Sequence, residues 1–595
     1  MLTTLRSALR PPSVPVKFEI PQSWRALVRA RESGLIVLAI LVGIVAGLLV
    51  ALMSFAVTLL HQLLFKVPPG ERLSGLDHID PVLAVAVPTL GGIVFGFALW
   101  LLLRWRPGRE IDPIEANALH GGRMSLRGSI IVAMQTVWSS GVGASVGLEA
   151  GYTQIASGLA STIGRAFRLR RRDLRVLVGC GAAAAIAGAF GAPLAGAFYA
   201  FELVIASYST ASLAPVGAAA LVGYLVASPF SHPSIGLGTL YVSHVTGADL
   251  AISALVGLAA AGVGITLMRC VAICEVVMNF LRIRPVIRPA IGGVAVGLMA
   301  IVTPEVLSSG HGAIKFSAMM SSPFTAVALV FLLKSMASIV SLGTGFRGGL
   351  FFASLLIGAL GGRLFADTVS LVLPSLSLDP HVYTIVGMGA LSVSVIGGPL
   401  TMTFIALETT GDFWLTAAVL VAIIVSAQVT REAFGYSFAT WRFHLRGEGI
   451  RSAADVGWLR ELTVRRMMRP DVRTVPSHTT VSRFRMVYPL GSTSHVVAVD
   501  EDKNYAGIIL VAEAHAGELD ETKPVRDILH FEHAVLLPTM SAKEAAALFD
   551  KAEAEALAVI ASTDEHEVVG LLTEAYVLRR YSEELEQRRQ DLLGE

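Results

Sequence analysis

The chain has 595 residues, of which 54% are hydrophobic and 15% are charged. Average soluble proteins have about 25% charged residues, so this composition excludes a single soluble globule and a disordered chain. The net charge of +2 is unevenly distributed: residues 1–446 carry 30 basic and 19 acidic groups (+11), and residues 447–595 carry 17 and 26 (−9). The sequence therefore predicts an apolar block followed by an ordinary soluble domain.

Long uncharged runs fill the apolar block. A membrane-spanning helix needs about 20 apolar residues. Runs of at least that length cover Gly34–Leu60, Pro81–Leu103, Val176–Phe201 and Leu203–Ala248. We predict an all-α polytopic membrane domain over residues 34–446. The arginine-rich residues 1–33 precede it and are expected in the cytoplasm by the positive-inside rule.

The cysteines and histidines offer no catalytic site. Cys180, Cys270 and Cys274 all lie in apolar stretches, which excludes a disulfide framework and a CxxC-type zinc site. The histidines lack a GxSxG or HExxH context. We therefore expect no enzyme activity, no metal site and no nucleic-acid partner.

Two segments of the membrane block repeat each other. Gly191–Glu202 (GAPLAGAFYAFE) and Gly397–Glu408 (GGPLTMTFIALE) share six of twelve positions. A weaker match pairs Val146–Thr153 with Thr344–Phe351. Related halves of a membrane domain place a substrate site at their interface, near the bilayer midplane.

Ionisable groups inside apolar runs are costly and mark functional sites by default. Glu149 lies among glycines in GLEAG, a sequence typical of a helix start, where free amides attract anions. A carboxylate there can take the place of an anion and leave when protonated. Glu202 and Glu408 end the two repeated segments, and their matched positions favour structural roles.

Further candidates for anion contact follow later in the chain. Gly348-Gly349-Leu350-Phe351-Phe352 predicts a second glycine-led helix start with free amides. Tyr436, in Gly-Tyr-Ser, offers either a phenol donor to an anion or an interfacial tyrosine of the membrane belt.

Together these features resemble the CLC family of chloride channels and proton/chloride exchangers. The resemblance implies an inverted internal repeat, a homodimer in the inner (plasma) membrane and cytoplasmic termini. It makes Glu149 the gate. It assigns anion contacts to Gly108 and Arg109 in the counterpart of the GSGIP segment, to Gly349, Leu350, Phe351 and Phe352 in the counterpart of GxFxP, and to the inner tyrosine Tyr436.

The chain departs from the family pattern at several of these positions. Leu148 replaces a basic residue of the gate motif, Ala353 replaces the GxFxP proline, and Arg109 stands where a serine contacts the anion. Leu203 stands where proton-coupled members often place a glutamate, and leucine cannot carry a proton. This implies loose or absent proton coupling, with Glu202, as the candidate internal proton site, or a water chain in place of the missing glutamate.

Residues 447–595 resemble a cytoplasmic α/β tail with two CBS modules, at about 460–515 and 521–585. Each module contains a predicted hairpin, at 496–510 and 557–572, with a polar acidic turn. Such pairs often bind adenine nucleotides. Here Tyr576 stands at the Asp position after Thr573, so we expect a structural or dimer-contact role and no cofactor.

The sequence thus predicts transport of chloride or a similar anion across a lipid bilayer, by a channel-like or weakly proton-coupled pathway gated by Glu149. A stoichiometric proton/chloride antiporter is the alternative within the family. A regulatory membrane sensor without ion flux and a cation-coupled solute carrier are alternatives from other classes. Flux that depends on chloride indicates the anion pathway, whereas flux that depends on sodium indicates the cation-coupled carrier. A reconstituted protein that carries no current favours the sensor.

Overall fold

The computed structural model describes residues 21, 32–105, 110–230, 245–313, 320–374, 376, 378–435, 437–438, 440–441, 463–516, 519–562 and 565–580. The chain divides into two compact units, residues 1–454 and 455–595.

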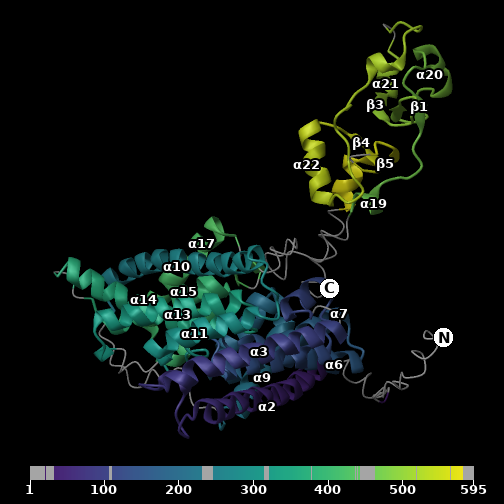
Figure 1. The fold of residues 1–595 in the computed structure, drawn as a ribbon. Coiled ribbons are helices and arrows are strands. Elements are labelled where there is room, and N and C mark those ends of the chain that lie inside the picture. The colour runs from purple at the N-terminus through teal and green to yellow at the C-terminus, as the bar shows by residue number, and fades with distance from the viewer. Residues whose placement is uncertain are drawn as a thin grey trace. The chain divides into compact units, whose positions relative to one another are not determined.

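All the named elements in the described residues of the first unit are helices (Figure 1). Eight helices of the described part are long and apolar enough to cross a membrane, in agreement with the predicted polytopic domain. They are α2 (Glu32–Phe65), α3 (Pro81–Trp105), α7 (Arg171–Phe190), α9 (Thr210–Ala227), α10 (Gly247–Phe280), α13 (Phe324–Gly343), α14 (Phe351–Val372) and α17 (Phe413–Ala433).

Shorter helices complete this unit. They are α4 (Pro113–Leu119), α5 (Leu126–Gly141), α6 (Glu149–Ala166), α8 (Pro193–Tyr199), α11 (Arg288–Val302), α15 (Pro380–Ile396) and α16 (Pro399–Thr410), with 3-10 turns η1 (Leu73–Gly75) and η3 (Pro304–Val306) and the π-helix η2 (Ala200–Ile205). Helices that stop short of a full span are tolerated in lipid where protein surrounds them.

Glycines let some helices approach very closely. α3 and α11 pack along their lengths through Gly92 and Gly293. A Cβ atom added at Gly92 would lie 2.4 Å from the Pro289 carbonyl oxygen, and one at Gly293 would lie 2.2 Å from that of Pro88. Side chains at these two positions would force the backbones apart, because small residues are what permits such contact in lipid.

Reciprocal hydrogen bonds relate the two halves of the membrane unit. The Ser145 amide donates to the Ser341 hydroxyl (2.9 Å), and the Arg347 amide donates to the Ser139 hydroxyl (3.1 Å). Ser145 and Arg347 are 202 positions apart, and so are Ser139 and Ser341. Each bond is therefore the counterpart of the other, as a pseudo-two-fold relation requires.

This relation corrects the register of the weaker repeat. The sequence match pairs Val146–Thr153 with Thr344–Phe351, a separation of 198. In the structure Gly147 faces Gly349, and Glu149 begins α6 as Phe351 begins α14, a separation of 202. Identities among glycine-rich segments misplaced the alignment by four residues.

The second unit has the predicted α/β organisation. β1 (Thr474–Pro476) pairs in parallel with β2 (His495–Val499), which pairs antiparallel with β3 (Tyr505–Leu510), and β4 (Ala556–Ile560) pairs antiparallel with β5 (Val568–Thr573). These β2–β3 and β4–β5 hairpins lie where the sequence predicts them. The helices here are α19 (Val464–Met467), α20 (Val481–Val487), α21 (Val511–Ala514), η4 (Val525–Ile528) and α22 (Ala542–Ala552).

Candidate functional site

The starts of α6 and α14 meet through two glycines. The Gly147 amide donates to the Gly349 carbonyl oxygen (2.9 Å), and the Gly349 amide donates to that of Gly147 (3.1 Å). This antiparallel bridge joins the two halves of the membrane unit directly before each helix begins. Two helix N-termini, with their partial positive charge, are therefore held beside one point.

Glu149 lies at this point. It is the first residue of α6 and is 4% exposed. Its carboxylate lies against the bridge, since a Cβ atom added at Gly147 would be 1.9 Å from its Oε2 and one at Gly349 would be 3.4 Å away. The glycines thus leave the space that this side chain fills.

The Glu149 carboxylate is buried and unpaired. Neither of its oxygens makes a hydrogen bond within the described part of the chain. The backbone amides of Glu149 itself and of Phe352 face it without hydrogen-bond geometry. A buried acceptor without a partner is costly, so this position favours a side chain that moves or takes up a proton.

The other residues expected at the second helix start lie together. Leu350 is the N-cap of α14, with no side-chain cap, and Phe351 and Phe352 form its first turn. All three are buried. The Phe351 ring packs 4.5 Å from that of Phe190, centroid to centroid. The first-turn amides of α14 therefore have no capping side chain and lie next to Glu149.

Three of the predicted anion contacts, Gly108, Arg109 and Tyr436, lie outside the described residues. The described chain resumes just after the first two. There Asp112 is the N-cap of α4, and its Oδ1 accepts from the Ile114 amide (2.8 Å).

The predicted proton site Glu202 caps another helix. Its Oε1 accepts from the Leu400 amide (2.8 Å), and its Oε2 accepts from the amide (2.9 Å) and hydroxyl (2.6 Å) of Thr401. Glu408 does the same for α8, accepting from the amides of Leu194 (2.8 Å) and Ala195 (2.9 Å). These bonds favour the structural role for both glutamates.

Two polar groups beside α14 were not singled out from the sequence as pathway residues. Lys334 of α13 is fully buried, and its Nζ donates to the carbonyl oxygens of Ser308 (2.9 Å) and Val306 (3.2 Å). His311, in the same loop, stacks on Phe352 with ring centroids 3.7 Å apart. In the sequence, Lys334 could have been noticed as a lone lysine within an apolar helical run.

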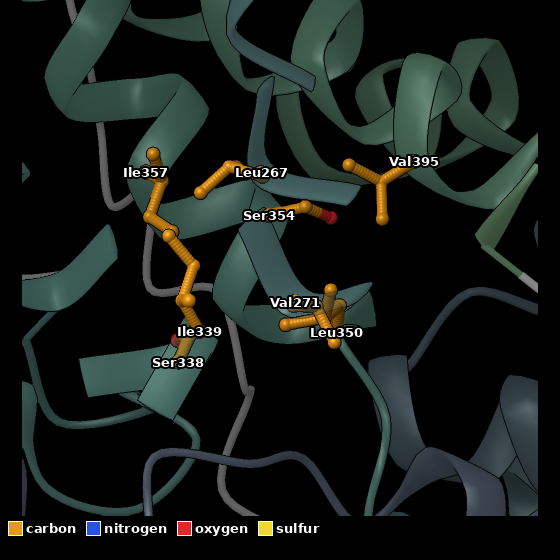
Figure 2. Close-up of a pocket in the computed structure, with 8 residues that line it drawn as sticks. All are labelled: Leu267, Val271, Ser338, Ile339, Leu350, Ser354, Ile357 and Val395. Carbon is orange, nitrogen blue, oxygen red and sulfur yellow. The ribbon is translucent and has the colours of Figure 1, made fainter. Parts of the chain in front are cut away.

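A small hollow borders the first turn of α14 (Figure 2). Leu350, the N-cap of α14, and Ser354 in its first turn line it, with side chains from α10, α13 and residue Val395. Its lining residues are uncharged and include two serines, Ser338 and Ser354.

The fold and the site define a membrane transport protein of two related halves, with two helix starts meeting at a buried acid. The family profile for voltage-gated chloride channels matches residues 91–431, and that for CBS domains matches residues 525–583. The chain belongs to the voltage-gated chloride channel (CLC) family, and it carries a CBS region.

Relatives in bacteria agree with this membership. A Ralstonia nicotianae protein named as a ClcB-like chloride channel is 32% identical over 59% of this chain and 82% of its own length. The voltage-gated ClC-type chloride channel ClcB of Escherichia coli O81 (strain ED1a) is 28% identical over 67% of this chain and 95% of its own.

Solved structures share the fold. A slow cyanobacterial Cl⁻/H⁺ antiporter matches with a TM-score of 0.60 and 21% identity, over 69% of this chain and 97% of its own. A eukaryotic CLC transporter matches with a TM-score of 0.58 and 18% identity, over 93% of this chain and 98% of its own. A CLC-type fluoride/proton antiporter matches with a TM-score of 0.54 and 21% identity, over 67% of this chain and 96% of its own.

Proposed function

We propose that the chain conducts chloride between the helix starts at Gly147 and Gly349 and that Glu149 gates this pathway. The observation that carries the proposal is the Glu149 carboxylate, buried against both glycines with neither oxygen hydrogen-bonded in the described structure. A deprotonated carboxylate there occupies the place of an anion beside two helix N-termini. Protonation removes its charge, and the side chain leaves the pathway.

Selection in this pathway comes from backbone amides and the shape of the passage. The first turn of α14 carries no capping side chain, so its amides are free to approach a partly dehydrated anion. Leu148 and Leu350, which precede the two helices, are apolar. A site built from amide dipoles binds chloride without a fixed positive charge, weakly enough for the ion to leave again.

We further propose channel-like or weakly proton-coupled transport. The Glu202 carboxylate is held by three hydrogen bonds at the start of α16, and its neighbour is Leu203. Neither the bonded Glu202 carboxylate nor the apolar Leu203 side chain is suited to carry a proton. Stoichiometric proton/chloride antiport is the second candidate, because two of the similar solved structures are named as proton-coupled antiporters.

For the whole protein we propose a homodimer in the inner (plasma) membrane, with both termini in the cytoplasm. We propose a structural or dimer-contact role for the tail, without adenine nucleotide. At the positions that would supply a ribose-binding Asp, the first module has the buried Ala514 and the second has Tyr576, and neither carries a carboxylate.

Chloride efflux from liposomes that contain the purified protein tests the proposal. Wild-type efflux should rise as the external pH falls, whereas Glu149→Gln and Glu149→Ala should conduct at a rate that no longer depends on pH. Glu408→Gln is the matched control, because this acid caps α8 outside the bridge. Retained pH dependence in both Glu149 variants would remove Glu149 from the gate, and absence of chloride flux in the wild type would contradict the proposed function.

A further inference from the structure

α3 and α11 form an antiparallel helix pair in the membrane unit (Figure 1). Gly92 of α3 faces the Pro289 carbonyl oxygen, and Gly96 faces that of Val286, in the turn that leads into α11. Residue numbers rise along α3 as those of its partner fall. The C-terminal end of α3 therefore lies beside the N-terminal end of α11.

Each helix of this pair exposes a regular row of large apolar side chains. The row on α3 contains Leu90, Ile93, Val94 and Phe97, and that on α11 contains Ile291, Val294, Leu298 and Ile301. Intervals of three or four residues place each row on one helix face. In a membrane unit such exposed apolar faces are the surfaces that meet lipid chains.

An aromatic residue and a cation follow the apolar row at the C-terminal end of α3. Trp100 lies one turn after Phe97 and is 42% exposed. The Arg104 guanidinium, one turn further along, lies over the Trp100 ring at 5.6 Å from its centroid, which is within cation–π range. Because tryptophan is enriched at the level of lipid headgroups, this end of α3 fits the membrane–water interface.

The turn before α11 carries further arginines at the same end of the pair. Arg282 and Arg284 are exposed. Arg288, the first residue of α11, donates from Nε to the Ile283 carbonyl oxygen (2.9 Å) and from Nη2 to Oδ1 of Asn279 (2.7 Å). These two bonds hold the turn together and leave the two exposed arginines on its surface.

The two segments that meet here contain no acidic residue. Residues 100–105 and 280–288 include arginines but no Asp or Glu, and the nearest acid along α10, Glu275, lies one turn before Asn279. We call Arg104, Arg282 and Arg284 the basic cluster. Its net positive charge lies directly at the end of the apolar rows.

We propose that the basic cluster, together with Trp100, binds the headgroup phosphate of an anionic phospholipid of the surrounding bilayer. A planar guanidinium matches a phosphate with two parallel hydrogen bonds. The apolar rows that lead to the cluster offer a surface for the acyl chains, which a free phosphate would not use. Basic side chains between membrane helices recognise anionic lipids in this way.

The proposal does not depend on the gating role of Glu149. α2 crosses the membrane and α3 returns, so α3 ends on the side where α2 begins. In the proposed orientation this is the cytoplasmic leaflet, whose surface is negatively charged.

Competition between two lipids tests the proposal on the full-length protein in detergent. Phosphatidylglycerol and phosphatidylcholine with identical acyl chains are added in equal amounts, and native mass spectrometry counts the molecules of each that stay bound. The test variant is the double substitution Arg104→Gln/Arg284→Gln. Arg104→Lys/Arg284→Lys keeps the charge, and Arg465→Gln/Arg483→Gln removes the same charge from exposed positions of the tail.

The wild type should bind phosphatidylglycerol in preference to phosphatidylcholine by at least about tenfold, and the glutamine pair in the membrane unit should lower this ratio by about fivefold for each arginine removed. The lysine pair and the tail pair should keep most of the preference. No preference in the wild type, an unchanged ratio in Arg104→Gln/Arg284→Gln, or an equal loss in the tail pair overturns the proposal.

Soluble competitors decide between a lipid and other anions. Glycerol phosphate and a polyglutamate peptide, each added at the lipid concentration, should leave phosphatidylglycerol bound, because neither has acyl chains to lie on the apolar rows. Displacement by glycerol phosphate would assign the cluster to a free phosphate, and displacement by the peptide would assign it to an acidic protein segment. Either result would overturn the proposed lipid site.

Discussion

Glu202 and Glu408 exchange helix caps across the pseudo-two-fold axis. Glu202, at the end of the first repeated segment, binds the start of α16, and Glu408, at the end of the second, binds the start of α8. The two acids are 206 positions apart, as are Leu194 and Leu400, whose amides they accept. Each half of the membrane unit therefore supplies the carboxylate that stabilises the dipole of the other half.

Removal of either cap should destabilise the protein to a similar extent. Glu202→Ala and Glu408→Ala each leave helix N-terminal amides without an acceptor, at an expected cost of about 1–2 kcal/mol. Glu202→Gln and Glu408→Gln keep one acceptor oxygen and should lose less. Thermal unfolding of the purified protein, followed by tryptophan fluorescence, measures this. Alanine variants as stable as the wild type would show that solvent satisfies these amides equally well.

Gly147 should control the gate through the space it leaves. In Gly147→Ala the new Cβ would lie 1.9 Å from Oε2 of Glu149, a flexible side-chain end that must move away. In Gly349→Ala the corresponding distance is 3.4 Å, an ordinary contact. We therefore expect Gly147→Ala to raise chloride efflux at neutral and alkaline pH, and Gly349→Ala to stay close to the wild type.

Efflux from liposomes at several pH values separates these two variants. Gly348→Ala shows what disruption of the fold looks like, because its Cβ would meet the Val146 side chain at 2.5 Å. Equal pH profiles for Gly147→Ala and the wild type would contradict the prediction, because the Glu149 carboxylate would then move without opening the gate.

Much of the fold follows from local pattern in the sequence. Runs such as Gly34–Leu60 predict the spanning helices, because a helix satisfies its backbone hydrogen bonds within one continuous segment in lipid. The alternating apolar residues around DEDKN predict the β2–β3 hairpin that the structure contains. Glu149 was identified because an acid among glycines in an apolar block has few structural explanations.

The rest depends on contacts between distant segments. The bridge between Gly147 and Gly349 joins residues about 200 positions apart, and no local periodicity encodes it. Identity counting therefore paired the weaker repeat four residues out of register.

Lys334 should stabilise the loop that packs on α14. Lys334→Met leaves the Ser308 and Val306 carbonyl oxygens without this donor, and an unmatched buried acceptor costs about 1–3 kcal/mol. The melting temperature of the purified protein should fall accordingly. Ser335→Ala is the control, since the Ser335 hydroxyl donates within its own helix, to the Phe331 carbonyl oxygen (2.7 Å). A Lys334→Met protein that melts at or above the wild-type temperature would contradict this role.

His495 should make the stability of the tail depend on pH. Burial in β2 lowers the pKa of His495 below its ordinary value of 6.5, and the nearby Glu555 partly opposes this. The unfolded chain therefore binds the proton first as the pH falls. The contribution is complete above about pH 6.5 and is lost as the pH drops below it, by at most about 1.4 kcal/mol per pH unit.

Hydrogen exchange of the β2–β3 amides in the full-length protein, corrected for the intrinsic effect of pH, measures this loss between pH 7.5 and 5. His495→Asn removes the titrating group and should flatten the profile. Glu555→Gln removes the opposing charge, which lowers the folded-state pKa of His495 further and extends the loss to lower pH. If His495→Asn keeps the wild-type slope, other groups of the tail carry the pH dependence, because only a group whose pKa differs between the folded and unfolded states contributes to it.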